Sequence, residues 1–227
     1  MWSRLGKVLW RLAWLALLVP VLLILSLRWI DPPTTSFILQ HNYSAWKSGT
    51  DFALHSWTDY ENISKHMSLA VVAAEDQRFP LHLGVDTTEI SRALQSPAEG
   101  RRGASTITQQ TAKNLFLWPA RSYVRKAMEA ALAITMELLL SKQRILEIYL
   151  NIAQTGQAMF GVTDAATTYF AKVPGKLNKF EAARIAAILP NPVKLSATQP
   201  TRYVVERQRW ILKQMEQLGG PRYLELL

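Results

Sequence analysis

The most prominent feature of the hydropathy pattern is an apolar block close to the N-terminus. Residues 12–27 contain no charged side chain, and Arg11 and Arg28 bracket them. With the apolar residues 8–10 included, the block approaches the ~20 residues that a helix needs to cross a bilayer, and Arg11 can extend its charge toward the surface. We therefore predict a transmembrane anchor within residues 1–30.

Basic residues on one side of this block predict its orientation. Arg4, Lys7 and Arg11 precede it, so the N-terminus should stay in the cytoplasm and the rest of the chain should cross. A cleaved secretory signal with the same basic start is the alternative. The apolar block is long for such a signal, and no small-x-small cleavage site follows it cleanly, so we favour the anchor.

Helical periodicity dominates after a connector that prolines mark. Asp31-Pro32-Pro33 ends the anchor helix, because proline biases the residue before it away from helix. Within the connector of residues 31–60, residues 37–60 show no sustained period, and we expect them to be irregular or to form short helices. From residue 61 onward, apolar residues recur at spacings of three and four, and no long alternation indicates a sheet. We predict an all-α globular domain over residues 61–227, with helices near 63–74, 123–141, 142–150, 181–189 and 203–218.

Composition and charge narrow the classes of protein. A chain of 227 residues suits one anchor and one globular domain, and the absence of cysteine excludes disulfides, cysteine metal sites and thiol nucleophiles. The formal net charge is +9, and the four basic residues before residue 31 leave a surplus of +5 on the exported part. A basic domain at a membrane surface attracts anionic headgroups or phosphate-bearing substrates. Export argues against nucleic acid as the partner.

Two adjacent acids follow the first apolar helix of the predicted domain. Glu75 and Asp76 point in different directions, so one can enter a cleft while the other braces the loop that holds Phe79, His82 and Gly84. A carboxylate at the end of an apolar helix has its pKa raised by desolvation, which suits a general base or acid. The alternative is a C-terminal helix turn whose acids are merely solvated.

A glycine- and hydroxyl-rich stretch then leads into another helix. Ser105 and Thr106 resemble a helix N-cap, with Gln109 and Gln110 following. Free backbone N–H groups at a helix N-terminus bind anions, and Lys113 would lie about two turns into this helix. An ordinary capping box is the alternative, although the stretch holds more polar side chains than a cap needs.

A basic cluster follows directly. Arg121, Arg125 and Glu129 are spaced by four and share one face if the helix begins by Arg121, whereas Lys126 is expected to face away. The cluster is either a solvated row of salt bridges or a cationic clamp with an embedded acid, as a diphosphate leaving group requires. The apolar residues 115–118 are either core or a patch that enters lipid.

Together these stretches resemble the signature motifs of the peptidoglycan glycosyltransferases, a family found alone or as the N-terminal domain of bifunctional penicillin-binding proteins. One departure is Gln154, where members often carry an acid. Because the chain ends soon after the last motif, we expect a monofunctional member without a transpeptidase domain. Five motifs occur in the family's order: Glu75-Asp76-x-x-Phe79-x-x-His82-x-Gly84, Gly103-x-Ser105-Thr106-Ile107-Thr108-Gln109-Gln110, Arg125-Lys126-x-x-Glu129, Lys142-x-x-Ile145-Leu146-Glu147-x-Tyr149-Leu150-Asn151 and Arg207-x-x-x-Ile211-Leu212-x-x-Met215.

The resemblance implies a lysozyme-like α-helical lobe with a smaller membrane-proximal lobe, outside the bacterial cytoplasmic (inner) membrane. The substrate would be lipid II, an undecaprenyl-diphosphate disaccharide-peptide, polymerised into β-1,4 glycan strands with inversion and loss of undecaprenyl diphosphate. Glu75 would be the general base, and Glu129 would be a second catalytic acid that positions the cations around the diphosphate. Nine residues would contact the substrate: Phe79, His82, Ser105, Thr106, Gln109, Gln110, Lys113, Arg121 and Arg125.

The resemblance leaves open whether a divalent metal such as Mg²⁺ binds at the diphosphate beside Glu129. Expected partners are lipid II, the growing glycan strand and the membrane, with cell-wall synthesis or division proteins as further candidates. Two other function classes remain. A lysozyme-like hydrolase or lytic enzyme would also use a catalytic glutamate, but its sugar leaving group would not require Lys113, Arg121 and Arg125. A non-catalytic anchored scaffold would tolerate the loss of Glu75.

Overall fold

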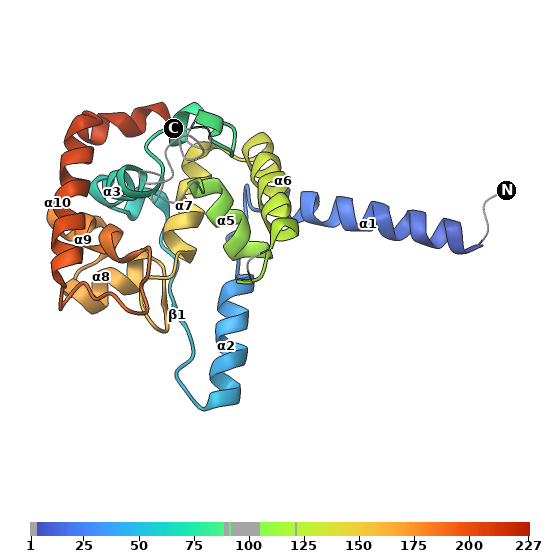
Figure 1. Ribbon diagram of the computed structural model, residues 1–227, viewed down its shortest axis with the longest axis horizontal. Coiled ribbons are helices and arrows are strands. Elements are labelled where there is room, and N and C mark those ends of the chain that lie inside the picture. Colours follow the sequence, from blue (N-terminus) through green and yellow to red (C-terminus); the bar gives the residue numbers. More distant parts are fainter. Residues whose placement is uncertain (1–3, 89–90, 92–104, 121) are drawn as a thin grey trace.

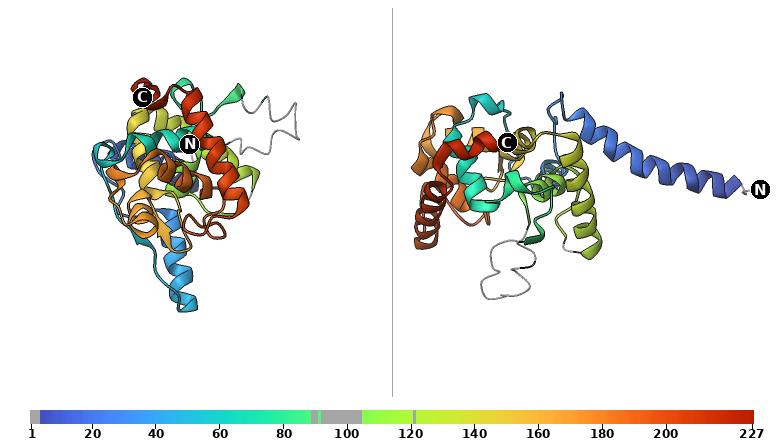
Figure 2. Two further views of the ribbon diagram at one scale, coloured as in Figure 1. Left: turned by 90° about the vertical axis from the view of Figure 1, so that its left-hand side faces the viewer. Right: turned by 90° about the horizontal axis from the view of Figure 1, so that it is seen from above.

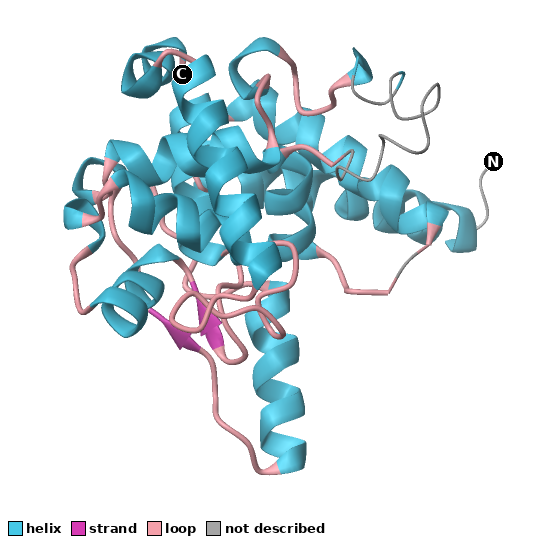
Figure 3. Cartoon of the chain, turned by 60° about the vertical axis from the view of Figure 1, so that its left-hand side comes forward, coloured by secondary structure: helices cyan, strands magenta, loops and turns pink. Residues whose placement is uncertain are grey.

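The computed structural model describes residues 4–88, 91, 105–120 and 122–227, and this part of the chain is mainly helical (Figures 1 and 3). The strands that it contains form one short parallel pair, in which β1 (Leu54–His55) lies beside β2 (Met159–Phe160). The prediction of a predominantly α-helical domain is therefore confirmed. The division into a lysozyme-like lobe and a smaller lobe stays a prediction.

Helix α3 (Lys65–Glu75) lies at the centre of the body and ends at the candidate site. It packs chiefly against α9 (Lys179–Ile188) and α10 (Arg202–Gln217) (Figure 1). Residues 67–73 are all buried, as expected for a helix that is apolar around its whole circumference. Each fully buried valine or leucine in such a run contributes about 1.5–3 kcal/mol to folding. The position of the last residue of α3 is thus set by the core itself.

A second group of helices supplies the other side of the candidate site. Helix α5 (Ile107–Phe116) packs against both α6 (Tyr123–Leu139) and α7 (Lys142–Ile152). Ser141 separates α6 from α7 because its side chain caps the second helix, accepting a hydrogen bond from the backbone N–H of Arg144. The described part of the body also contains α8 (Val162–Phe170) and the short 3₁₀ helices Tyr60–Asn62, Phe79–Leu81, Pro174–Lys176 and Gly220–Leu226.

The predicted connector, expected to be irregular or short helical, contains one regular helix. Helix α2 (Ser36–Ser48) projects from the body (Figures 1 and 3). Its ends are defined by local chemistry, since the Thr35 hydroxyl accepts from the N–H of Ile38, and Gly49 adopts a left-handed conformation with φ +67°. Caps, more than apolar periodicity, account for this helix.

The N-terminal helix α1 (Arg4–Ser26) extends away from the body (Figures 1 and 2). Ile24 and Leu27, at its body end, are buried, whereas Leu12, Leu15 and Leu22 are each about half exposed. A search for membrane-spanning helices, limited to the described residues, finds none with the required length and apolar character.

A side-chain clamp ties α7 to the strand region. The amide of Asn151 accepts from the backbone N–H of Thr58 (2.8 Å) and donates to its carbonyl (2.9 Å). Gly161, the N-cap residue of α8, has φ +89°, and a Cβ there would lie 2.5 Å from the backbone carbonyl oxygen of Asn151. This contact explains why a glycine occupies the junction.

Replacing Gly161 by alanine is therefore expected to destabilise the fold by more than about 1 kcal/mol, through both positive φ and the clash with Asn151. Gly49→Ala is the matched control, since Gly49 also has positive φ but no atom within 4 Å of the added Cβ. Urea denaturation of both variants separates the two costs. Equal losses would contradict a steric requirement at Gly161.

Candidate active site

The loop after α3 is held by the second of the two adjacent acids. Asp76 is buried, and both its carboxylate oxygens lie 3.0 Å from Nε2 of His82. One of these oxygens also accepts from the backbone N–H of Ile107 (3.0 Å), at the start of α5. Asp76 therefore joins the end of α3, the following loop and the N-terminus of α5, where a negative charge is favourable. It braces the loop, and Glu75 is left to face α5.

Glu75 lies at the junction of three helices. Nε2 of Gln110 on α5 donates to Oε2 of Glu75 (2.9 Å). The hydroxyl of Tyr149 on α7 donates to Oε1 of Gln110 (3.2 Å). Burial raises the pKa of Glu75; the Gln110 hydrogen bond and the charges of Arg207 and Lys113 oppose the rise, while the Asp76 charge adds to it. A carboxylate whose pKa is raised toward neutrality suits proton transfer near physiological pH.

The polar residues at the start of α5 form two pairs with different environments. Thr106 and Gln109 form a reciprocal capping box: the Thr106 hydroxyl accepts from the backbone N–H of Gln109 (3.1 Å), and the side-chain oxygen Oε1 of Gln109 accepts from the backbone N–H of Thr106 (3.2 Å). Both side chains are buried, so we do not retain them as substrate contacts. Ser105 and Gln110 differ, since Ser105 accepts from Lys126 (2.7 Å) and Gln110 holds Glu75.

Helix α6 carries the cationic cluster. The buried carboxylate of Glu129 pairs with Arg125 through one oxygen and with Lys126 through the other (3.0 Å). The expectation that Lys126 faces away is wrong, because residues three apart on a helix are also neighbours. Arg121 lies outside the described residues. Glu129 thus positions two cations near Ser105 and α5.

Lys113 lies between Glu75 and this cluster. Burial lowers its pKa; the charge of Glu129 raises it, Arg125 and Lys126 lower it further, and Glu75 raises it. The ammonium group also lies 5.2 Å from the centre of the Phe37 ring at the start of α2. Lys113 therefore experiences the charges of both Glu75 and the Glu129 cluster, and links the two halves of the site.

Phe79 and His82 support the loop and do not line an open surface. Phe79 is fully buried, with the ammonium group of Lys142 4.4 Å from its ring centre, and His82 is bound to Asp76. Lys142 also donates to the His82 carbonyl (2.6 Å) and pairs with Glu137 (2.8 Å). The structure therefore gives both predicted substrate contacts a bracing position.

Sequence reasoning assigned no role to three residues that shape this site. Tyr149 and Lys142 belong to the fourth motif and Arg207 to the fifth, so their presence was visible but their partners were not. Arg207 donates to the Ala74 carbonyl (2.9 Å), which brings its charge to the end of α3. The atypical Gln154 donates to the Gly156 carbonyl (2.9 Å), a bond that an ionised acid at this position could not make.

A metal is not accommodated readily by these residues. No cluster of three or more potential His, Asp or Glu ligands occurs within the described ranges. Both oxygens of Glu129 are already paired with cations. Because the surrounding charges are positive, the arrangement fits an anion better than a divalent cation.

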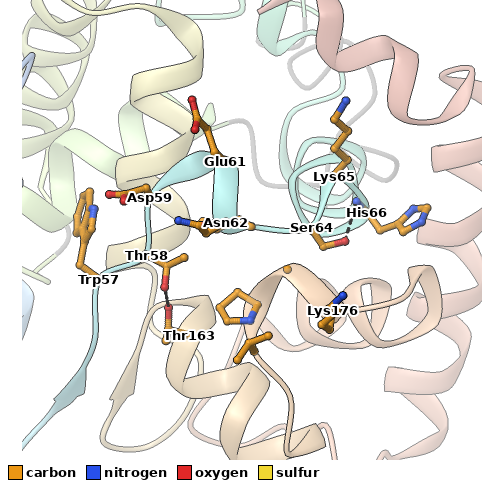
Figure 4. Close-up of a pocket in the computed structure, with 14 residues that line it drawn as sticks. Trp57, Thr58, Asp59, Glu61, Asn62, Ser64, Lys65, His66, Thr163 and Lys176 are labelled. Carbon is orange, nitrogen blue, oxygen red and sulfur yellow. Dashed lines mark hydrogen bonds between the residues drawn. The ribbon is translucent and has the colours of Figure 1, made fainter.

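A hollow lies at the opposite, N-terminal end of α3 (Figure 4). It measures about 850 Å³ and is lined by residues that include Trp57, Asp59, Glu61 and Lys176. The ten residue steps from Lys65 to Glu75 correspond to about 15 Å along a helix, so this hollow is separate from Glu75. The candidate general base and the cations lie toward the other end of the helix.

Glu75 is a partly accessible carboxylate with a raised pKa that experiences the charge of Lys113. Lys113 in turn interacts with the cluster in which buried Glu129 holds two further cations. Such an arrangement can remove a proton at one point and stabilise developing negative charge at a neighbouring one. It fits a transfer reaction with an anionic leaving group.

Comparison with known proteins gives a consistent result. A family model described as "Transglycosylase" matches residues 46–216. A protein named "Biosynthetic peptidoglycan transglycosylase" from Marinomonas sp. is 48% identical over 219 residues, 96% of this chain and 93% of its own length. Proteins of the same name from Pseudomonas putida (45% identical, covering 90% of this chain and 88% of their own) and Escherichia coli O139:H28 (50%, covering 85% and 82%) are similar.

Proposed function

The chain belongs to the transglycosylase family, and from this premise we propose that Glu75 is its general base. The protein is a peptidoglycan glycosyltransferase of cell-wall synthesis, with lipid II and the growing glycan strand as substrates. The observation that carries the assignment of the site is the partly accessible Glu75 carboxyl with a raised pKa, linked through Lys113 to the cations that Glu129 holds. A hydrolase would have no use for that cluster, since its leaving group is a neutral sugar.

The proposed reaction is a single inverting displacement. Glu75 removes the proton from the 4-hydroxyl of the acceptor sugar as that oxygen attacks the anomeric carbon of the donor. The new β-1,4 bond forms while the bond to the lipid diphosphate breaks, and the diphosphate leaves with the electron pair. The raised pKa of Glu75 supports this role, because a stronger base accepts the hydroxyl proton more readily, provided that it is ionised at the working pH.

The leaving diphosphate is proposed to bind at the cationic cluster. Lys113 and Arg125 would neutralise the charge that develops on its oxygens, with Arg121 as a further candidate. Glu129 acts here as a positioning residue, since it holds Arg125 and Lys126 by direct contacts. We derive no step through a divalent metal, because those contacts occupy both oxygens of Glu129.

The enzyme is proposed to work at the outer face of the cytoplasmic membrane, held there by α1 with its N-terminus inside. The uninterrupted apolar residues 12–27 support this placement, as do the half-exposed leucines of α1 and its projection away from the body (Figure 2). An undecaprenyl tail cannot leave the bilayer, so its enzyme must reach that surface. Division and cell-wall synthesis proteins remain candidate partners.

Charges placed on α1 should release the full chain from membranes. We expect the variant with both Leu15→Asp and Leu22→Asp to lose most of its co-sedimentation with phosphatidylcholine–phosphatidylglycerol vesicles, because each buried Asp costs about 2.5–3.5 kcal/mol. Val193→Asp is the control, since Val193 is equally exposed but lies far along the chain. Unchanged sedimentation of the double variant would remove α1 from the proposal.

The proposed function is tested with purified full chain in detergent and labelled lipid-linked disaccharide-pentapeptide. We expect a polymer that lysozyme digests, formed together with free undecaprenyl diphosphate. Shortening of preformed glycan without any polymer from the lipid-linked unit would overturn the proposal in favour of a hydrolase.

A further inference from the structure

The hydrogen bond from Gln110 to Glu75 is backed by a second one, from Tyr149 to Gln110. The amide of Gln110 has two partners at once: its nitrogen donates to Oε2 of Glu75 (2.9 Å), and its oxygen accepts from the Tyr149 hydroxyl (3.2 Å). The three side chains come from α3, α5 and α7, so the contact connects helices whose positions are set independently by the core. The Tyr149 side chain is fully buried.

The chemistry of an amide makes this second contact directional. One end of the Gln110 amide only donates and the other only accepts, so the group has two orientations with opposite consequences for a neighbouring carboxylate. With nitrogen toward Glu75, the amide stabilises the ionised carboxylate. With oxygen toward Glu75, it repels that carboxylate and stabilises the protonated acid, which can donate.

Tyr149 distinguishes between the two orientations. Burial, together with the charges of Glu75 and Asp76, raises the pKa of Tyr149 well above its usual range, so the phenol keeps its proton. That proton needs an acceptor, because an unpaired buried donor is costly. The Gln110 oxygen is the acceptor in the structure, and the reverse orientation of the amide would remove it.

We propose that Tyr149 is a positioning residue that holds the Gln110 amide with its nitrogen toward Glu75 and so keeps the base in its ionised, proton-accepting form. This inference rests on the proposed role of Glu75 as the general base. Tyr149 acts on the ionisation of Glu75 entirely through Gln110 and does not contact the substrate.

The other charged groups that face Glu75 act independently of the amide. Arg207 from α10 and Lys113 from α5 favour the carboxylate, whereas the adjacent Asp76 disfavours it. Removing the Tyr149 hydroxyl leaves all three in place. A change in the titration of Glu75 after that removal therefore reports the orientation of Gln110.

The test is the pH dependence of polymerisation by Tyr149→Phe. We expect the acid limb of kcat/KM to move upward by about one pH unit, which makes turnover below the limb about tenfold slower. On the high-pH plateau, kcat should stay within a few-fold of the wild type, and KM should change little. Tyr169→Phe is the matched control, since it also removes one hydroxyl bound to an acceptor, the Thr155 carbonyl (2.7 Å).

A double variant tests whether the effect of Tyr149 on the acid limb passes through Gln110. Gln110→Met alone should move the acid limb in the same direction, and adding Tyr149→Phe should move it no further. Gln110→Met also supplies the readout if Tyr149→Phe does not fold. An unchanged limb in either single variant, or an additional shift in the double variant, would overturn the inference; absence of polymer from the wild type would instead contradict the proposed function.

Discussion

Glu75→Gln is expected to abolish detectable glycan synthesis, with a loss of at least about 10²–10⁴-fold in rate. The substitution keeps the shape of the side chain and still offers an oxygen to Nε2 of Gln110, so the local packing survives. What disappears is the ability to accept the acceptor-sugar proton. The assay is polymer formation from labelled lipid II, followed over pH to exclude a shifted optimum.

The folding of this variant is expected to be intact or improved. Glu75 has a raised pKa because its charged form is poorly solvated, so replacing it by a neutral amide removes that cost. Glu61→Gln is the matched control: Glu61 is an exposed acid that lines the hollow at the opposite end of α3. Near-normal synthesis by Glu75→Gln, together with a loss of synthesis in Glu61→Gln, would show that the catalytic base lies at the opposite end of α3.

Lys113→Ala is expected to lower kcat/KM by about 10²–10³-fold, comparable to removing one preorganised donor from an anionic transition state. Lys113 is half-buried between Glu75 and the Glu129 cluster, where the reduced solvent strengthens its interaction with a diphosphate. The measurement is release of undecaprenyl diphosphate together with polymer length, at several substrate concentrations.

The stability of Lys113→Ala should change little, because burial disfavours the removed charge, and repulsion by Arg125 and Lys126 opposes its attraction to Glu129 and Glu75. Lys176→Ala is the control, as Lys176 lines the distant hollow. Unchanged kinetics for Lys113→Ala would remove this residue from the diphosphate site. A loss of equal size in both lysine variants would point to general substrate attraction by a basic surface.

The helices of the domain were predictable because apolar spacing determines which face is buried. The predicted helices at 123–141 and 203–218 correspond to α6 (Tyr123–Leu139) and α10 (Arg202–Gln217) within two residues at each end. The bounds of helix α2 could not be predicted, because its stability depends on Thr35, Gly49 and contacts with α5 more than on a regular apolar period.

The candidate site was predictable in its composition but only partly in its geometry. Spacing along α6 correctly placed Arg125 on Glu129, since both lie on one helix. Contacts between helices depend on tertiary packing, so the positions of Tyr149 and Arg207 near Glu75 could not be read from spacing. A capping box and a substrate-binding loop also share residue types, and only the structure shows that Thr106 and Gln109 are used for the cap.

The single acid within the cationic cluster has a kinetic consequence. Glu129 compensates one of the three charges on Lys113, Arg125 and Lys126, which leaves a surplus of two positive charges in the cluster. If the diphosphate leaves at this cluster, as proposed, it would be attracted as a product as well as in the transition state. Its escape would then be a separate barrier in the catalytic cycle, and dissolved salt would lower that barrier by screening the attraction. We therefore expect product inhibition to weaken as ionic strength rises.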